Sequence, residues 1–303
     1  MTAGLRPPGK QAAQVTGDVR PVTLGLVLHA LRVLREEMNP EMEKRIEAAK
    51  RAVQGQTTRL HRGFRRAKST WKSDGTRVTA ADLAISEAIL RELHEQFPED
   101  QGFSEELLDA DQPIAATARF CWVLDPIDGT NNYAAGVPFC AISLALLENG
   151  QPVYGVVYDM ARRALIHGGP GLGAFDGRKP AQARPEAPHA NSLIAFHSPL
   201  DPTLAPRAVP LIQQFKIRGL GSSTLHLAYV GIGLIDGVLD FNVRVWDIAA
   251  AYPIALGGGA EVHFLKNNPF PLRQFDLAMP RIHFVAGNRE ICARLRELLA
   301  DSQ

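Results

Sequence analysis

Apolar residues recur at helical spacing in three segments of the N-terminal third of the chain. A spacing of three or four residues places these side chains on one face of a helix, so each segment is predicted to be helical. Thr79 stands just before the third segment, where its hydroxyl is suited to capping a helix, and Asp82 suits the first turn. The three predicted helices span residues 24–34, 41–54 and 80–96.

Short apolar runs replace the helical pattern after Phe97-Pro98. Turn-forming residues separate the runs, and residues 148–152 are typical of the loop of a β-hairpin. The pattern therefore predicts strands that pair in an antiparallel manner. They are expected at residues 120–124, 139–147, 153–158, 164–167 and 174–175.

The C-terminal part alternates strands with helices, which is typical of an α/β lobe. Strands are expected at residues 193–196, 237–245, 260–265 and 282–286. Helices are expected at residues 202–215, at 222–232, directly after Trp246-Asp247, and at 288–300.

This organisation predicts a mixed fold class, α+β followed by α/β, in two lobes. Residues 1–20 are rich in proline and glycine and are expected to be a mobile leader. Residues 21–185 are expected to form the N-terminal α+β lobe, and residues 186–303 the C-terminal α/β lobe. The polar, Pro/Ala-rich segment 177–191 is the expected linker between them.

Composition places the chain among globular proteins. Of its 303 residues, 46% are hydrophobic and 21% charged, which argues against a disordered or fibrous protein. The formal net charge is +1, whereas proteins that wrap nucleic acid or coat anionic membranes carry a large basic excess. Three cysteines without a CxxC spacing argue against a disulfide framework or a structural zinc site, and for a reducing compartment.

The N-terminus resembles no secretory signal, and the apolar stretch at 22–34 is too short to span a bilayer, so a soluble, cytoplasmic protein is expected.

A basic segment is hidden within the neutral total charge. Residues 59–72 hold six Lys/Arg and no acid, and they are predicted to be extended chain. Together with Phe64 and Trp71 they are compatible with binding of single-stranded nucleic acid, but a solvated strand or loop is the favoured interpretation. The rest of the chain is net acidic, and six acids without any Lys/Arg lie between Glu99 and Asp111.

The most informative stretch for chemistry runs from Trp122 to Tyr133, WVLDPIDGTNNY. The predicted strand stops at Asp125, and Asp128 follows after the chain turns, so that two carboxylates and the Ile127 carbonyl can face one point. Three converging oxygen ligands suit a hard cation such as Mg²⁺.

The next two residues of this stretch suit an anion. Gly129 permits close approach to the backbone, and a helix that starts near Thr130 would favour negative charge at its N-terminus. A cation and an anion at one place are what phosphate-ester chemistry needs. Asp-Pro and Asp-Gly are also ordinary turn dipeptides, so an isolated motif of this kind is explained equally well by a turn.

Two further acidic segments favour a metal site over an ordinary turn. Glu105 lies in the sequence FSEE, upstream of Asp125. Asp247 lies in VWDIAAAY at the start of a predicted helix, upstream of the glycines at 257–259. Taken singly, each of these two segments is explained by local structure, and capping accounts for Asp247.

Taken in this order, after the segment Lys72–Asp82, these pieces resemble the inositol monophosphatase superfamily of Mg²⁺-dependent, lithium-sensitive phosphatases. The first signature of that family, DPIDGTxN(F/Y), is matched fully by Asp125–Tyr133. The second, WDxAAxxxxxxxxGG, is matched from Trp246 to Gly259, with Ala260 in place of the last glycine. The resemblance implies a layered α-β-α-β-α sandwich, and its motifs are only weakly specific for substrate.

The resemblance also implies a two-metal site, with a third, weaker Mg²⁺ near Glu105. The implied ligands are Glu105, Asp125 and the Ile127 carbonyl for the first Mg²⁺, and Asp125, Asp128 and Asp247 for the second. Glu105 and the Thr130 hydroxyl are expected to position and activate the attacking water. The amides of Gly129 and Thr130 are expected to bind phosphate oxygens.

On the alcohol side, the resemblance implies four substrate contacts: Asp128, Gly221, Ser222 and Asp240. Asp240 stands where inositol-specific relatives have glutamate, so the identity of the polyol stays open. Asp240, Asn242 and Arg244 alternate on a predicted strand and are expected to share a face. We hypothesise that Arg244 approaches the substrate and favours a second anionic group, the alternative being a solvated arginine at the strand rim.

Three other positions bear on this site. Lys72 is a possible contact near the mobile metal loop, and Arg77 replaces the small residue or proline that relatives often have there. Pro253 is expected to kink or shorten the helix after Asp247 without moving its first turn.

The resulting prediction is a Mg²⁺-dependent phosphomonoesterase, with an inositol or sugar monophosphate as the expected substrate. Alternatives within the class are histidinol-phosphate phosphatase, 3′(2′),5′-bisphosphate nucleotidase and fructose-1,6-bisphosphatase. A catalytically idle binding protein is the alternative from another class. The resemblance further implies a homodimer, which the apolar region 137–147 would suit.

Overall fold

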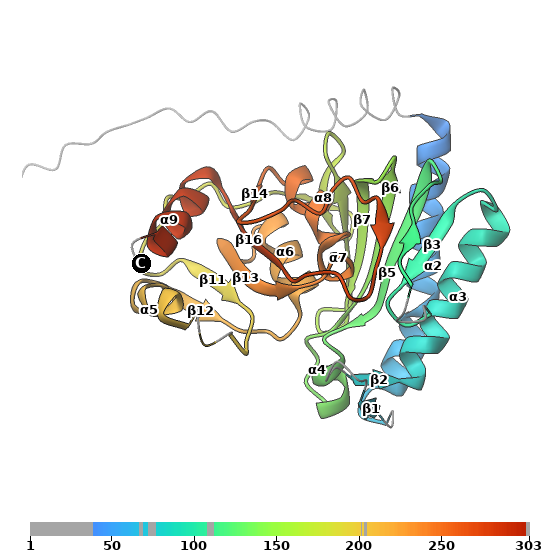
Figure 1. The fold of residues 1–303 in the computed structure, drawn as a ribbon, viewed down its shortest axis with the longest axis horizontal. Coiled ribbons are helices and arrows are strands. Elements are labelled where there is room, and N and C mark those ends of the chain that lie inside the picture. The colour runs from blue at the N-terminus through green and yellow to red at the C-terminus, as the bar shows by residue number, and fades with distance from the viewer. Residues whose placement is uncertain are drawn as a thin grey trace, which may run out of the picture. The chain divides into compact units, whose positions relative to one another are not determined.

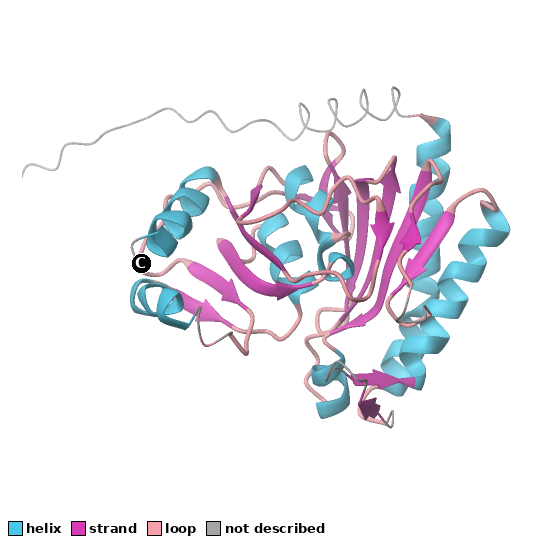
Figure 2. Cartoon of the chain, viewed as in Figure 1, coloured by secondary structure: helices cyan, strands magenta, loops and turns pink. Residues whose placement is uncertain are grey.

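Two β-sheets with helices between them form the framework, and further helices cover the outer face of each sheet (Figures 1 and 2). The computed structural model describes residues 39–66, 69–71, 77–107, 112–200, 202 and 205–300. The predicted leader 1–20, the predicted helix 24–34 and Lys72 lie outside these residues. In the described part, no helix is both long and apolar enough to cross a membrane.

Helices α2 (Pro40–Gly63) and α3 (Ala80–Gln96) cover one face of the larger sheet. The predicted cap of α3 is confirmed: the Thr79 hydroxyl accepts the amide of Ala81 at 3.2 Å, and Asp82 accepts the amide of Thr79 at 2.8 Å. The prediction that residues 59–72 are extended is wrong for residues 59–63, which belong to α2. Leu60 is fully buried and continues the apolar face of the helix, and this contact outweighs the charge of its neighbours.

The larger sheet has seven strands in the order β10-β9-β8-β7-β6-β5-β3. All neighbours in it are antiparallel except β3 and β5, so the hairpins expected from the sequence are confirmed. The strands are β3 (Gln101–Ser104), β5 (Phe120–Asp128), β6 (Ala141–Glu148), β7 (Gln151–Asp159), β8 (Ala164–Gly169), β9 (Gly173–Asp176) and β10 (Lys179–Ala181).

The smaller sheet has five strands in the order β12-β11-β13-β16-β14. They are β11 (Leu193–Phe196), β12 (Lys216–Arg218), β13 (Gly237–Val243), β14 (Glu261–Phe264) and β16 (Ile282–Gly287). Helices α5 (Ala205–Gln214) and α9 (Arg289–Ala300) cover its outer face. Two short ladders complete the strands: β1 (Ser69–Trp71) with β2 (Arg77–Thr79), and β4 (Ile114–Ala115) with β15 (Gln274–Phe275).

Helices α6 (Ser223–Gly231), α7 (Val245–Ile248) and α8 (Ala251–Gly257) fill the layer between the sheets. Pro253 lies in the first turn of α8, and the helix after Asp247 is correspondingly short, as expected. A Cβ on Gly155 of β7 would lie 1.8 Å from the carbonyl oxygen of Ala250, so glycine permits the backbones to approach closely here.

These layers form the expected α-β-α-β-α sandwich. One buried apolar cluster unites the inner faces of both sheets with α6, α7 and α8. Two further clusters lie under α2 and α3, and under α5 and α9. The division into lobes at residue 185 stays a prediction, since the inner cluster draws residues from both sides of it.

His167 on β8 is a half-buried titratable group. Its ring lies 5.1 Å from that of Phe175 between centroids. Its Nε2 donates to the Gly177 carbonyl at 3.0 Å, and its Nδ1 accepts from the Tyr154 hydroxyl at 2.7 Å. Burial lowers the pKa of His167 from 6.5 to about 4.

We expect His167 to make the fold sensitive to acid. The unfolded chain takes up a proton near pH 6.5 and the folded chain only near pH 4, so the free energy of unfolding falls by about 3 kcal/mol as the pH drops through this window. Urea unfolding of wild type and His167→Phe at pH 7 and pH 4.5 measures this. The variant should lose less stability on acidification, whereas the half-exposed control His263→Phe should behave as wild type. Equal losses in all three would contradict the expectation.

Candidate active site

A cavity of about 350 Å³ lies where the ends of β3, β5, β11 and β13 meet α4 (Thr130–Ala135) and α7. Four acids line it: Glu105, Asp125, Asp128 and Asp247. Ser104 of β3 pairs with Leu124 of the parallel strand β5, so the next residues, Glu105 and Asp125, emerge at the same edge of the sheet. The structure thus brings together acids that lie far apart in the sequence.

An irregularity in β5 explains how Asp125 and Asp128 reach the same cavity. Residues three apart on a regular strand point to opposite faces. Asp125 pairs with Ser143 and Asp128 with Ala141, so β5 carries one residue more than β6 between these pairs. This bulge turns both carboxylates to one side. It also corrects the expectation that the strand stops at Asp125, because pairing continues to Asp128.

Hydrogen bonds hold the three aspartates with their carboxylates close together. One oxygen from each of Asp125, Asp128 and Asp247 lies within 4.8 Å of the others. Asp125 accepts the amide of Ile127 at 3.0 Å, and Asp247 accepts that of Arg244 at 2.6 Å. Asp128 accepts the Ser222 hydroxyl at 2.6 Å and the amide of Thr224 at 2.7 Å.

The closeness of these acids in the cavity disfavours their charged forms. Burial, followed by the charges of the other acids in the cavity, raises the pKa of Asp125 well above its usual range. Burial, followed by the charge of Asp128, raises the pKa of Asp247 to about 8. A bound cation would relieve this repulsion. The donor set consists of carboxylates and the Ile127 carbonyl, which fits a hard divalent cation.

Gly129 and Thr130 follow the acids directly and also line the cavity. Gly129 has a φ of 84°, and a Cβ there would lie 2.8 Å from the Phe139 carbonyl oxygen, so this position requires glycine. Thr130 is the first residue of α4, as expected, and its hydroxyl donates to the Ile127 carbonyl at 2.9 Å. That bond ties the hydroxyl to a predicted metal ligand.

The predicted contacts on the alcohol side are only partly in the cavity. Gly221 lines it, whereas Ser222 is fully buried and caps α6 by accepting the amide of Leu225 at 3.2 Å. Asp240 is fully buried and does not line the cavity. The side-chain hydroxyl of Ser223 donates to it at 2.9 Å, and the amide of Asn242 at 2.9 Å.

The expected common face of Asp240, Asn242 and Arg244 does not form. The register shifts between Asp240 and Val243, where β13 ends, and Arg244 precedes the first residue of α7. Asn242 and Arg244 line the cavity without Asp240. The Arg244 guanidinium donates to the carbonyls of Leu277, at 3.0 Å, and Met279, which anchors it to the loop before β16.

Among the polar residues of the cavity that were not predicted as site residues are His197, Ser223 and Arg281. His197 follows the predicted strand 193–196, and Ser223 follows the predicted Gly221-Ser222 pair, so their positions beside strand and motif ends were the available signals. Arg281 carries no signal of its own in the sequence. Arg77, which the sequence marks as unusual, also lines the cavity.

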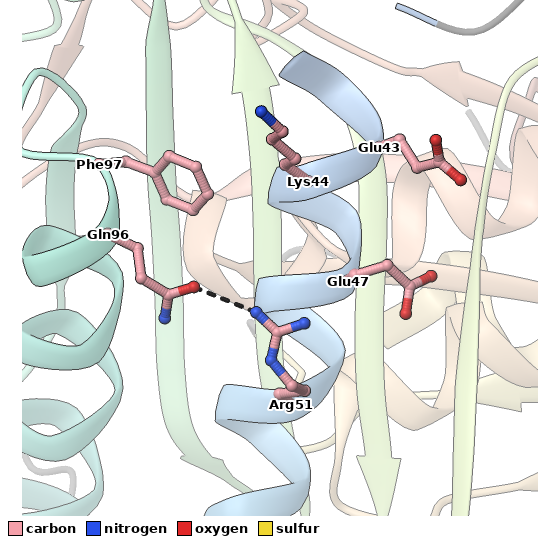
Figure 3. Close-up of a pocket in the computed structure, with 6 residues that line it drawn as sticks. All are labelled: Glu43, Lys44, Glu47, Arg51, Gln96 and Phe97. Atoms are coloured by element: carbon pink, nitrogen blue, oxygen red, sulfur yellow. Dashed lines mark hydrogen bonds between the residues drawn. The ribbon is translucent and has the colours of Figure 1, made fainter. Parts of the chain in front are cut away.

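A second hollow, of about 480 Å³, lies on the surface between α2 and α3 (Figure 3). Arg51 donates to Gln96 across it at 3.1 Å, and Glu43 and Glu47 point away on the other side of α2. Because its charged side chains diverge, this hollow has no converging ligand set and is not a candidate site.

Comparison with known proteins matches this geometry to one family. Residues 38–302 match the model of the inositol monophosphatase family. The chain is 31% identical to Nus factor SuhB of Xylella fastidiosa over 73% of this chain and 80% of that protein, and 30% identical to inositol monophosphatase 1 of Sus scrofa over 64% and 73%. It also resembles the solved structure of an IMPase from Thermotoga maritima, with a TM-score of 0.73 and 25% identity over 86% of this chain and 98% of that one. The chain therefore belongs to the inositol monophosphatase family and is a phosphatase, that is, a phosphoric monoester hydrolase.

Proposed function

We propose that the protein hydrolyses the phosphate monoester of inositol, or of a related sugar or polyol, with Mg²⁺ as its metal. The observation that carries the proposal is the group of three aspartate oxygens within 4.8 Å of one another, beside Glu105 in a cavity. The family is metal-dependent and its substrates are small phosphorylated molecules. Mg²⁺ prefers oxygen ligands and substrate phosphates, which fits the donor set here.

The residues that would hold the metals are those of the acidic cluster. They are Glu105, Asp125 and the Ile127 carbonyl for one ion, and Asp125, Asp128 and Asp247 for another. When bound, such ions supply charge neutralisation at the phosphate and a more acidic water molecule.

The chain's own groups then have defined tasks. Glu105 accepts a proton from the attacking water, and the Thr130 hydroxyl, fixed by its bond to Ile127, orients that water. The amides of Gly129 and Thr130 bind phosphate oxygens on the same side. Water attacks the phosphorus and the bond from phosphorus to the ester oxygen breaks. The leaving alkoxide takes a proton from a water molecule, and Glu105 returns the proton it accepted to solvent.

A substrate with a second anionic group is the other candidate that a specific observation favours. Arg77, Arg244 and Arg281 line the cavity together with the acids. Once metals neutralise the carboxylates, these guanidinium groups would leave the cavity positive and suited to a bisphosphate. This keeps the bisphosphate nucleotidase and fructose-1,6-bisphosphatase alternatives open, as well as the hypothesis for Arg244.

A panel of phosphate esters tests the proposal. We expect hydrolysis of inositol monophosphate with Mg²⁺, no turnover after chelation with EDTA, and recovery when Mg²⁺ is restored, measured as released inorganic phosphate. Li⁺ is expected to lower the rate. Turnover of none of the esters, or turnover unaffected by EDTA, would contradict the proposal, whereas a preference for a bisphosphate would select the second candidate.

A further inference from the structure

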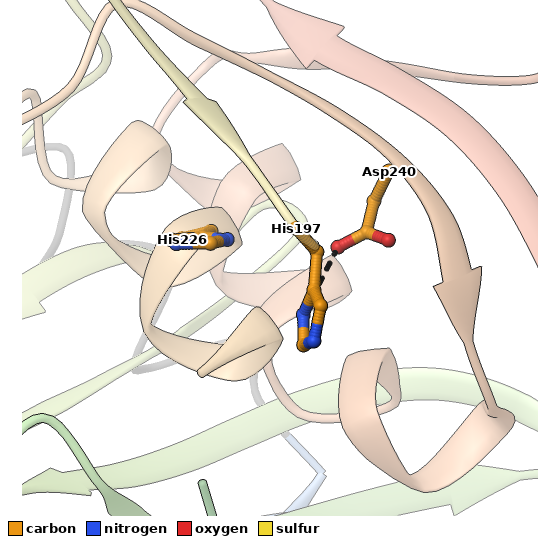
Figure 4. Close-up of side chains that lie close together, drawn as sticks. All are labelled: His197, His226 and Asp240. Carbon is orange, nitrogen blue, oxygen red and sulfur yellow. Dashed lines mark ion pairs between the residues drawn. The ribbon is translucent and has the colours of Figure 1, made fainter. Parts of the chain in front are cut away.

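His197, His226 and Asp240 form a second close group of side chains, beside the acidic cluster (Figure 4). One ligand atom from each lies within 4.8 Å of the others, as in many metal sites. His226, however, accepts the amide of Leu220 at Nε2, at 2.9 Å. Its other nitrogen, Nδ1, must therefore carry the proton of the neutral ring. Burial lowers the pKa of His226 to about 3, so the ring stays neutral and neither nitrogen has a lone pair to offer a metal.

The remaining two residues belong to a directed chain of hydrogen bonds. The Ser223 hydroxyl donates to the Asp240 carboxylate at 2.9 Å, and His197 Nδ1 lies 2.7 Å from the same hydroxyl oxygen. Because the serine proton is already used, His197 must donate from Nδ1. Asp240 itself is held by the amide of Asn242. The chain thus fixes the tautomer and the orientation of the His197 ring.

The solvent exposure of the side chains shows which end of this series of hydrogen bonds can contact the substrate. Asp240 is fully buried, whereas the His197 side chain is 23% exposed and lines the cavity with Ser223. Figure 4 shows the His197 ring apart from that of His226, with the ion pair of 3.8 Å between its Nδ1 and the Asp240 carboxylate drawn as a dashed line. In the described part of the chain, Nε2 of His197 has no hydrogen-bond partner. With Nδ1 protonated, Nε2 of the neutral ring is an acceptor, and the partner it suits is a hydroxyl group.

We propose that His197 contacts the alcohol part of the phosphate ester and accepts a hydrogen bond from a substrate hydroxyl, with Ser223 and Asp240 as positioning residues behind it. This inference rests on the proposed function. Asp240, the acid expected to contact the polyol directly, lies too deep to do so. The His197 imidazole lies at the cavity wall and makes the contact in its place. The ligand class is therefore a phosphate ester whose alcohol bears further hydroxyl groups.

The test compares two esters that differ only in hydroxyl groups, inositol 1-phosphate and cyclohexyl phosphate. In wild type with Mg²⁺, we expect kcat/KM to be higher for the inositol ester. His197→Ala should lower kcat/KM for inositol 1-phosphate about tenfold and leave that for cyclohexyl phosphate unchanged, because only the former loses a hydrogen bond. Ser223→Ala, which keeps the ring but frees it, should raise KM for the inositol ester by a smaller factor and leave kcat nearly unchanged.

His263→Ala is the matched control, since this half-exposed histidine pairs with Glu261 away from the cavity, and it should leave both esters unchanged. Circular dichroism and melting temperature verify that each variant folds. Equal losses on both esters, no loss on either, or a wild type without preference would overturn the role of His197 while the phosphatase function stands. A wild type that hydrolyses neither ester would overturn the proposed function, and this inference with it.

Discussion

Asp125→Asn is expected to lower metal-dependent hydrolysis by about 10³-fold or more. Asp125 is the central acid of the cluster, close to both Asp128 and Asp247, and it is the ligand that two metals would share. Asparagine keeps the shape and an oxygen that can accept the Ile127 amide, but it removes the charge that would bind the cation. Initial rates of phosphate release at saturating Mg²⁺ measure the loss.

The same variant should not unfold. Because burial and neighbouring acids raise the pKa of Asp125, its charged form is unfavourable in the metal-free protein, and asparagine removes that cost. We therefore expect a melting temperature in EDTA equal to or above that of wild type. Asp176→Asn, at an ion pair with Arg162 away from the cavity, is the control and should keep full activity. Activity of Asp125→Asn within tenfold of wild type would sink the assigned site.

Arg45→Ala is expected to lower the free energy of unfolding by about 3–5 kcal/mol, through a mechanism unrelated to catalysis. The side chains of Arg45 and Asp100 are 5% and 2% exposed, and two hydrogen bonds, of 2.9 and 2.8 Å, join them. The guanidinium also lies against the rings of Phe97 and Phe120, at 4.5 and 4.1 Å. Alanine would leave the Asp100 carboxylate buried without its cation.

Urea unfolding at pH 7 measures this effect, with Arg51→Ala as the matched control. Arg51 is an exposed arginine of the same helix, and in the described part of the chain its guanidinium bonds only to Gln96, so its loss should cost no more than about 1 kcal/mol (Figure 3). A cost below about 1 kcal/mol for Arg45→Ala would show that Asp100 finds other partners. The rate of hydrolysis by the folded variant should be unchanged, since Arg45 lies outside the cavity.

Local elements of the fold were predictable because their signals are local. Helix α3 has the predicted bounds and the predicted cap, since Thr79 and Asp82 satisfy backbone groups within one turn of themselves. The end of α2 was not predictable in this way. The basic run from residue 59 pointed to solvent, but burial of Leu60 against the sheet extends the helix to Gly63.

The acidic site was predictable to a similar depth. Short motifs around Asp125 and Asp247 predicted the ligand chemistry, and the structure gathers these acids in one cavity. The residues that reach the alcohol side of the cavity were not predictable, because this depends on how deeply each side chain is buried. Whether Asp240 or His197 reaches the cavity is set by how β13 and α6 pack, and spacing along the chain does not report that.

By itself, the sequence determined the kinds of elements, the family motifs and the identity of the acids, since each depends on residues close together in the chain. Only the tertiary structure decided how they act. The bulge in β5 turns Asp125 and Asp128 to one side, and the parallel pairing of β3 with β5 brings Glu105 beside them. Packing between the sheets buries Asp240 and leaves the His197 ring at the cavity wall, because burial and register arise from contacts between distant segments.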